Sequence, residues 1–152
     1  EWQLQQTSQW MNQAQRLRPH LWVYLQREGK VTEPMMALRL YGTPADFGIS
    51  LEVSFIERKK DERTLGKQAK VLKVPTVEGV YYLVYSDGQS QRWEANEENR
   101  QILRNKLSNQ EVRKVLVKID VPITENSSEE EIVEALLKSY DKILPFYLAT
   151  RN

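Results

Sequence analysis

The aromatic residues in the stretch VEGVYYLVYSDGQSQRW, Val77 to Trp93, are the first candidates for a binding surface. On a β-strand, Tyr81 and Tyr85 share one face, and Tyr82 lies on the other face with the neighbouring valines. Exposed rings stack on unpaired or flipped bases, and each stacked base contributes about 1–3 kcal/mol. We therefore predict a base contact from Tyr81, Tyr85 or Trp93. The alternative is a strand buried on both faces, with tyrosine hydroxyls that reach the surface.

A basic stretch, RKKDERTLGKQAK, supplies candidates for phosphate contacts. It carries six basic side chains against two acidic ones, whereas acid is concentrated at 94–98 and 125–134. One basic and one acidic side would let a nearly neutral protein contact a phosphate backbone. The residues predicted to do so are Arg58, Lys59, Lys60, Arg63 and Lys67. The alternative is a solvated loop.

The residues that catalysis would need are sparse. His20 is the single histidine, whereas a catalytic triad or a zinc site needs further partners. Asp46 and Glu57 resemble the acidic residues of a metal-dependent nuclease, but one continuous strand between them would separate them by about 35 Å. There is no cysteine and no phosphate-binding glycine loop. We expect no cofactor, no metal and no catalysis in this segment; an enzyme using Asp46, Glu52 and Glu57 is the weakest reading.

Length and composition predict an ordinary folded domain. The chain has 152 residues, 40% of them hydrophobic, and a formal net charge of +1. We predict one domain over 1–152, cut from a longer protein because the first residue is Glu1. No apolar run approaches the ~20 residues of a membrane span. The absence of cysteine fits the reducing cytoplasm, which is the expected location.

Hydrophobic periodicity predicts an α+β fold with a mostly antiparallel sheet. Helices are expected over 1–18, 95–107 and from a Ser128–Glu131 capping box to Leu144, where Pro145 breaks or kinks the last one. Strands are expected over 20–26, 35–42, 47–59, 71–74 and 114–121, with a hairpin around Asp87–Gly88. Residues 61–70 are read as a loop or a short helix.

The strand over 47–59 has the clearest alternation. Apolar side chains fall on one face from Phe47 to Phe55, and Gly48, Ser50, Glu52 and Ser54 fall on the other. This period of two predicts a half-buried antiparallel strand.

Three segments resemble a known family. The opening SQWMNQAQ (8–15), EGVYYLVYSDG (78–88) and EEEIVEALLKSYDKILPFY (129–147) look like the N-terminal DNA-recognition domains of bacterial McrB-type, modification-dependent restriction proteins. The resemblance implies an α/β domain that is followed by a GTP-hydrolysing AAA+ motor and can flip a modified cytosine into a pocket. The nucleolytic subunit is then a separate partner.

The match is limited to Gly79, Tyr81 and Tyr82 within the second segment. The Pro-Trp strand motif of that family is missing after Gly42, where TPADFGISLEV stands, so no pocket residue is carried over.

The expected function is a non-catalytic DNA-binding specificity module of a bacterial restriction or defence protein. Its expected partners are DNA and further domains of the same polypeptide, with no membrane and no small-molecule cofactor. The alternative is a protein-interaction or assembly domain. It would dock through the apolar stripe of the 1–18 helix or through an exposed LPFYLAT end at 144–150.

Overall fold

The structure is a computed structural model that describes residues 3–7, 22–26, 33–43, 45–55 and 61–151. The elements follow one another as β1 (Gln3–Thr7), β2 (Trp22–Gln26), β3 (Met35–Thr43), β4 (Asp46–Ser54), α1 (Glu62–Ala69), the 3-10 helix η2 (Lys70–Lys73), β5 (Val80–Ser86), β6 (Gln89–Glu94), α2 (Glu97–Ser108), β7 (Lys114–Ile123) and α3 (Glu129–Arg151). None of the helices in these ranges is both long and apolar enough to cross a membrane.

The strands form one seven-stranded sheet in the order β1-β2-β3-β4-β7-β5-β6. Every neighbouring pair is antiparallel, and the sheet with its helices confirms the predicted α+β class. Strand β7 comes from late in the chain and lies between β4 and β5. It therefore joins the four strands β1 to β4 to the β5–β6 hairpin. The middle of the sheet is therefore held together by contacts between distant parts of the sequence.

The predicted N-terminal helix over 1–18 is wrong where the structure describes it. Gln3–Thr7 is strand β1, which pairs with β2 at the edge of the sheet, and the first described helix begins at Glu62. The pairing supplies the backbone of β2 with hydrogen-bond partners that a helix would not offer. The apolar stripe that suggested a helix, from Trp10 to Leu17, lies outside the described residues.

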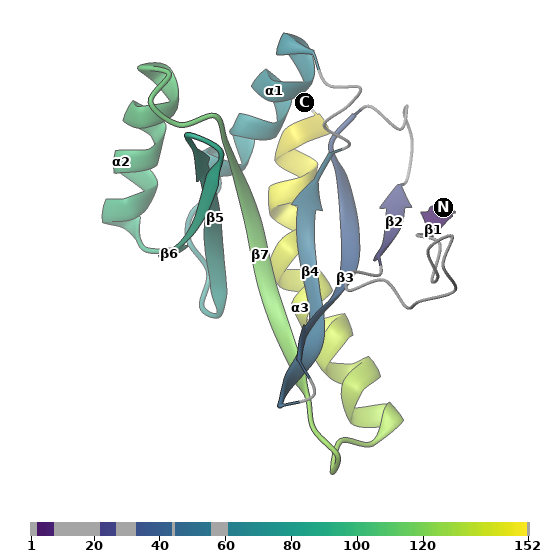
Figure 1. Cartoon of the computed structure of the whole chain (residues 1–152). Coiled ribbons are helices and arrows are strands. Elements are labelled where there is room, and N and C mark those ends of the chain that lie inside the picture. The colour runs from purple at the N-terminus through teal and green to yellow at the C-terminus, as the bar shows by residue number, and fades with distance from the viewer. Residues whose placement is uncertain (1–2, 8–21, 27–32, 44, 56–60, 152) are drawn as a thin grey trace, which may run out of the picture.

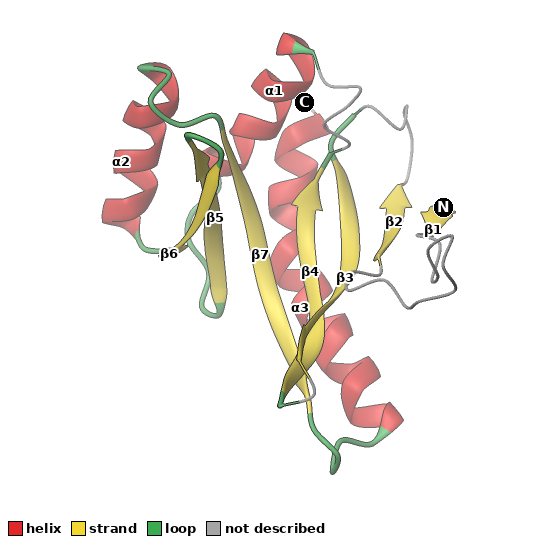
Figure 2. Ribbon diagram, viewed as in Figure 1, coloured by secondary structure: helices red, strands yellow, loops and turns green. Residues whose placement is uncertain are grey.

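In the described part of the chain, the three α-helices and η2 lie on one face of the sheet, so this part has two layers (Figures 1 and 2). Helix α3 runs diagonally behind β4 and β3 and packs on β4 and β7. We call this side the helix face. The opposite side, which carries Tyr81, is called the Tyr81 face.

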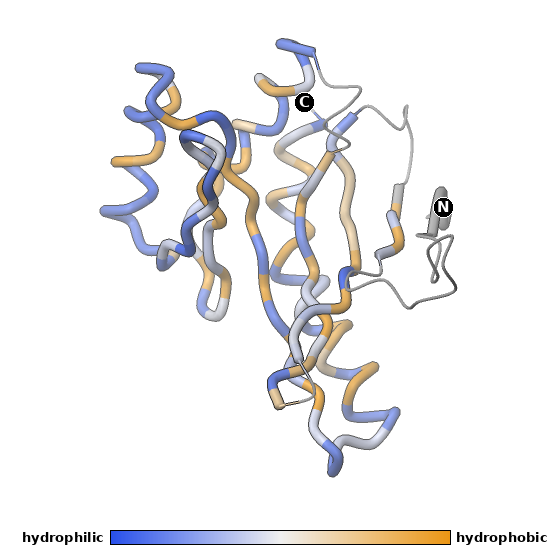
Figure 3. Tube along the Cα trace, viewed as in Figure 1, coloured by the Kyte–Doolittle hydropathy of each residue, from blue (hydrophilic) through white to orange (hydrophobic). Residues whose placement is uncertain are grey.

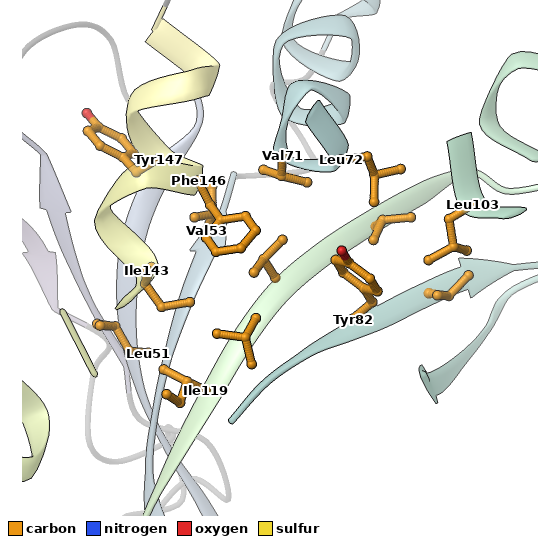
Figure 4. Packing of buried hydrophobic residues seen from close by; sticks show 14 of the residues in the cluster. Leu51, Val53, Val71, Leu72, Tyr82, Leu103, Ile119, Ile143, Phe146 and Tyr147 are labelled. Carbon is orange, nitrogen blue, oxygen red and sulfur yellow. The ribbon is translucent and has the colours of Figure 1, made fainter. Parts of the chain in front are cut away.

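The main core fills the space between the helices and the helix face. Ile143 and Phe146 of α3 point toward Leu51 and Val53 of β4, as Figure 4 shows. Tyr82 of β5 lies in the same cluster and is fully buried. The hydrophobic effect of this burial, about 1.5–3 kcal/mol for each large side chain, holds the two layers together.

Two local predictions are confirmed in detail. Asp87 and Gly88 both have positive φ, 50° and 76°, which is the geometry of the hairpin turn expected between β5 and β6. At the start of α3, Ser128 N donates to Glu131 Oε2 at 2.9 Å, and Glu131 N donates to Ser128 Oγ at 3.2 Å. This is the reciprocal capping box.

Three other expectations are corrected. Residues 71–74 are not a strand, since most of them belong to η2, whose Val71 and Leu72 enter the core. Helix α3 continues through Pro145 to Arg151. The LPFYLAT end is exposed only in part, because Phe146, Tyr147 and Thr150 are each at most 1% exposed, whereas Leu148 is 42% exposed. Phe146 and Tyr147 belong to the core between α3 and the sheet.

The strand over 47–59 is also more deeply placed than its alternation indicates. Strand β4 ends at Ser54 and lies between β3 and β7. Ser50, Glu52 and Ser54, predicted to face solvent, are at most 5% exposed. A central position buries both faces of this strand, and its polar side chains find partners on the neighbouring strands.

Candidate nucleic-acid interface

Strand alternation sorts the aromatic residues as predicted for β5. Val80, Tyr82 and Val84 belong to the core on the helix face, and Tyr81 and Tyr85 point to the other side. Trp93 pairs with Tyr82 and packs against the same core. The structure therefore brings Tyr81 and Tyr85 together on one face and places Trp93 on the opposite one.

The ring of Tyr81 is already covered by an arginine. Arg92 Cζ lies 3.7 Å from the centroid of the ring, and Tyr81 is only 8% exposed. The cation is attracted to the electron-rich face of the ring. The side chain of Arg92 is itself 64% exposed, so solvent reaches this side chain and not the ring of Tyr81 beneath it.

Asp120 of β7 connects these two side chains. The Tyr81 hydroxyl donates to Asp120 Oδ1 at 2.9 Å, and Arg92 Nη1 lies 3.4 Å from Asp120 Oδ2. Burial and the negative charge of Asp120 both raise the pKa of Tyr81, so its hydroxyl stays protonated and can donate at neutral pH. The carboxylate thus fixes both the ring and the guanidinium above it.

Tyr41 reaches the same group across β4. A Cβ at Gly48 would lie 2.4 Å from the Tyr41 hydroxyl oxygen, so the glycine leaves room for this ring on the sheet. Burial raises the pKa of Tyr41, and the charges of Asp120 and Asp46 raise it further. Tyr41 therefore shares the electrostatic surroundings of the Tyr81–Asp120–Arg92 group.

A buried ion network lies beside that group. Glu52 is 1% exposed; its Oε1 lies 3.0 Å from Arg39 Nη2 and its Oε2 lies 2.9 Å from Lys118 Nζ. Burial opposes ionisation of Glu52, but the charges of Lys118 and Arg39 outweigh it and lower the pKa of the carboxyl. Lys118 of β7 lies directly opposite Glu52 of β4, and Arg39 of β3 lies diagonally across from it, two residues along from the partner of Glu52.

Two further cations lie against rings on the Tyr81 face. Lys114 Nζ is 4.1 Å from the centroid of Tyr85 and 5.4 Å from that of Phe55. Arg39 Cζ is 5.6 Å from the centroid of Trp22. With Arg92 over Tyr81, three cations lie against four rings on this face.

The charges on the Tyr81 face balance among the described residues. Four basic residues, Arg39, Arg92, Lys114 and Lys118, alternate with the acids Asp46, Glu52, Glu94 and Asp120. The face therefore offers stacking planes and directional donors, without a large attraction for phosphates.

The two predicted phosphate contacts that the structure describes lie on the other face of the sheet. Arg63 and Lys67 are on α1, which packs on β7 and α3 on the helix face, and Lys67 Nζ pairs with Glu33 Oε2 at 2.8 Å. Arg58, Lys59 and Lys60 lie outside the described residues. The structure thus does not bring Arg63 and Lys67 together with Tyr81 and Tyr85.

The candidate catalytic residues do not converge in the described part of the chain. Asp46 is exposed at the tip of the β3–β4 hairpin, and Glu52 is held by its two cations. His20 and Glu57 lie outside the described ranges. Within those ranges, no three histidine or acidic side chains form a group that could hold a metal ion.

Arg92 was missed by the sequence reasoning, although a signal for it exists. A two-residue turn at Asp87–Gly88 fixes the partners in the hairpin, so Leu83 faces Arg92 and Tyr81 faces Glu94. Arg92 then lies diagonally across from Tyr81 on the same face, within reach of a long side chain. No local sequence signal predicts the places of Asp120 and Lys118, because β7 and β5 are far apart in the sequence and no short turn fixes how they pair.

No protein-family profile matches the chain, and no curated protein matches it significantly. The resemblance to restriction proteins therefore stays a prediction.

Proposed function

We propose that this protein binds DNA by stacking an unpaired or flipped base on the outer face of the Arg92 guanidinium. The observation that carries the proposal is the layered arrangement of Arg92 on Tyr81, with Asp120 bonded to both and the arginine side chain 64% exposed. Guanidinium planes are recurrent stacking partners of unpaired bases.

The arrangement is suited to this task because it is preorganised. Ordering a free arginine on binding costs about 0.5–1.5 kcal/mol. The contacts of Arg92 with the Tyr81 ring and Asp120 meet part of this cost before a ligand arrives. Guanidinium N–H groups lie in the stacking plane and can donate to base edges or to a phosphate.

The proposal keeps DNA as the ligand and moves the contact surface from the 58–70 stretch to the Tyr81 face. Because the charges on this face balance among the described residues, binding is expected to depend on salt less than binding by a basic patch does. Membership of a restriction or defence protein, and a cytoplasmic location, remain predictions of the sequence.

The test measures fluorescence anisotropy of labelled single-stranded and duplex oligonucleotides, including duplexes with one mismatched base. Arg92→Ala is compared with Arg104→Ala, which removes the same charge from an exposed position on α2. Arg92→Ala should weaken binding by roughly 5–150-fold, equivalent to the loss of one stacked base, and Arg104→Ala should have little effect.

Arg92→Lys separates stacking from charge. Lysine keeps the positive charge but has no plane, so its affinity should stay close to that of Arg92→Ala. Full recovery with lysine, equal effects of the two alanine variants, or no binding of any oligonucleotide at low salt would each overturn the proposal.

A further inference from the structure

Helix α3 has a second apolar side that faces away from the core. Ile143, Phe146 and Tyr147 are buried against the sheet, whereas Val133, Leu137 and Leu148 are 53%, 61% and 42% exposed. Figure 3 shows hydrophobic positions recurring along the whole helix. A lone exposed leucine is ordinary, but a stripe of apolar side chains at helical spacing is typical of a contact surface.

The stripe is self-complementary. Leu144, which is half-buried and packs against the core at the edge of this side, lies at helical spacing between the exposed positions, so the apolar residues are 133, 137, 144 and 148. These positions are symmetric about the midpoint between 140 and 141. In an antiparallel pair of such helices, Val133 meets Leu148 of the second copy and Leu137 meets Leu144 of the second copy. A two-fold interface requires a patch that matches itself in this way.

We propose that α3 packs antiparallel against α3 of a second copy of this chain, forming a two-fold dimer. With 23 residues, α3 is about 34 Å long. This length lets apolar side chains of the two helices meet at intervals of three to four residues over several turns.

The charges at the two ends of the stripe support the antiparallel direction. Glu129, Glu130 and Glu131 occupy the first turn of α3, and Arg151 lies in its last turn. Antiparallel packing places Glu130 beside Arg151 of the second copy at both ends. The two helix dipoles are also opposed, which is the favourable orientation. A parallel pair would instead bring the three glutamates of each copy together.

The dimer goes beyond the proposed function and stands without it. Because α3 covers the face opposite Tyr81, pairing through α3 leaves the Arg92 surface of each copy free and directed outward. Loss of the dimer would therefore leave base binding by each copy intact, so the two proposals fail separately.

Sedimentation velocity over a range of concentrations tests the assembly. The unchanged chain should form a dimer, and Leu137→Glu should raise the dimer dissociation constant on the order of 30-fold or more. Ser90→Glu, which adds the same charge at an exposed site of β6 on the Tyr81 face, is the control and should leave the constant unchanged. Circular dichroism is used to check that both variants are folded. A chain that stays monomeric at the highest concentration, or a dimer indifferent to Leu137→Glu, would refute the proposal.

Cysteine cross-linking tests the direction, since the chain contains no natural cysteine. Positions 133 and 148 lie about 22 Å apart along one helix, too far for an internal disulfide. The Val133→Cys, Leu148→Cys double variant should therefore form covalent dimers on mild oxidation, and each single variant should not. Cross-linking by the single Val133→Cys variant would indicate a parallel pair and overturn the antiparallel arrangement.

Discussion

Tyr81 and Tyr82 are neighbours in β5, yet their hydroxyl groups lie in opposite environments. The Tyr81 hydroxyl donates to Asp120 at 2.9 Å on one face of the sheet. The Tyr82 hydroxyl is buried on the other face and has no hydrogen-bond partner among the described residues. Burial raises the pKa of Tyr82 to about 12. The alternation of a single strand thus separates a tyrosine that is bonded to Asp120 from a tyrosine in the core.

Replacing each of these tyrosines by phenylalanine should have opposite consequences. Tyr81→Phe removes a bond to a charged acceptor and should lower the free energy of unfolding by about 1–2 kcal/mol. Tyr82→Phe removes a buried hydroxyl without a described partner, so the free energy should be unchanged or rise by up to about 1 kcal/mol. Urea denaturation of the two variants measures the difference. A larger loss for Tyr82→Phe would show that its hydroxyl is bonded.

The Arg39–Glu52–Lys118 network should be sensitive to loss of its only acid. Glu52→Gln keeps the shape but leaves two largely buried cations without a counter-charge, which should cost about 3 kcal/mol of unfolding free energy. The control is Glu134→Gln, because Glu134 pairs with Lys138 at 2.7 Å but both side chains are about 70% exposed. Water screens that pair, so stability should hardly change. If Glu52→Gln and Glu134→Gln lowered the free energy of unfolding equally in urea denaturation, burial would not determine how much each ion pair stabilises the fold.

The same network predicts how stability depends on pH. The pKa of Glu52 is lowered in the folded state from its ordinary 4.5, so ionised Glu52 favours folding at all pH values above that. This contribution is lost as the pH falls below 4.5 through the folded-state pKa. The stability difference between the unchanged chain and Glu52→Gln should therefore be constant near neutrality and shrink in acid. A difference that grows on acidification would mean that the folded-state pKa is raised.

Predictions from the sequence succeeded where the cause is local. The alternation of β5, the positive φ values at Asp87 and Gly88, and the capping box at Ser128 each depend on a few consecutive residues. Part of the proposed binding surface was also predictable from local sequence. The two-residue turn fixes the pairing of β5 with β6, so the place of Arg92 on the same face as Tyr81 could have been predicted.

The failures have a common physical origin in long-range pairing. Strand β4 alternates like a half-exposed strand, but its neighbours β3 and β7 bring Arg39 and Lys118 to Glu52 from 13 and 66 positions away. Likewise, the nearness of Arg63 and Lys67 to β4 in the sequence does not reveal which face of the sheet α1 covers. Periodicity describes one element, and the choice of neighbours depends on the whole chain.

Gly48 and Gly66 provide a matched pair of glycines with opposite expected effects. A Cβ at Gly48 would lie 2.4 Å from the Tyr41 hydroxyl oxygen and 2.5 Å from the carbonyl oxygen of Val121, whereas a Cβ at Gly66 meets nothing within 4 Å. Gly48→Ala should therefore lower the free energy of unfolding by about 1–3 kcal/mol, since side chain and backbone must both shift. Gly66→Ala, inside α1, should raise it by about 0.5–1 kcal/mol because alanine favours the helix.

Adding Tyr41→Ala to Gly48→Ala should show where the crowding arises. Removing the ring relieves one of the two contacts, but the Val121 carbonyl belongs to the neighbouring strand and cannot be removed. The loss of stability caused by Gly48→Ala should therefore be smaller in a Tyr41→Ala background but should not vanish. This comparison is a double-mutant cycle measured by urea denaturation. If the loss is identical in both backgrounds, Tyr41 does not lie over Gly48, and its ring does not belong to the group around Asp120.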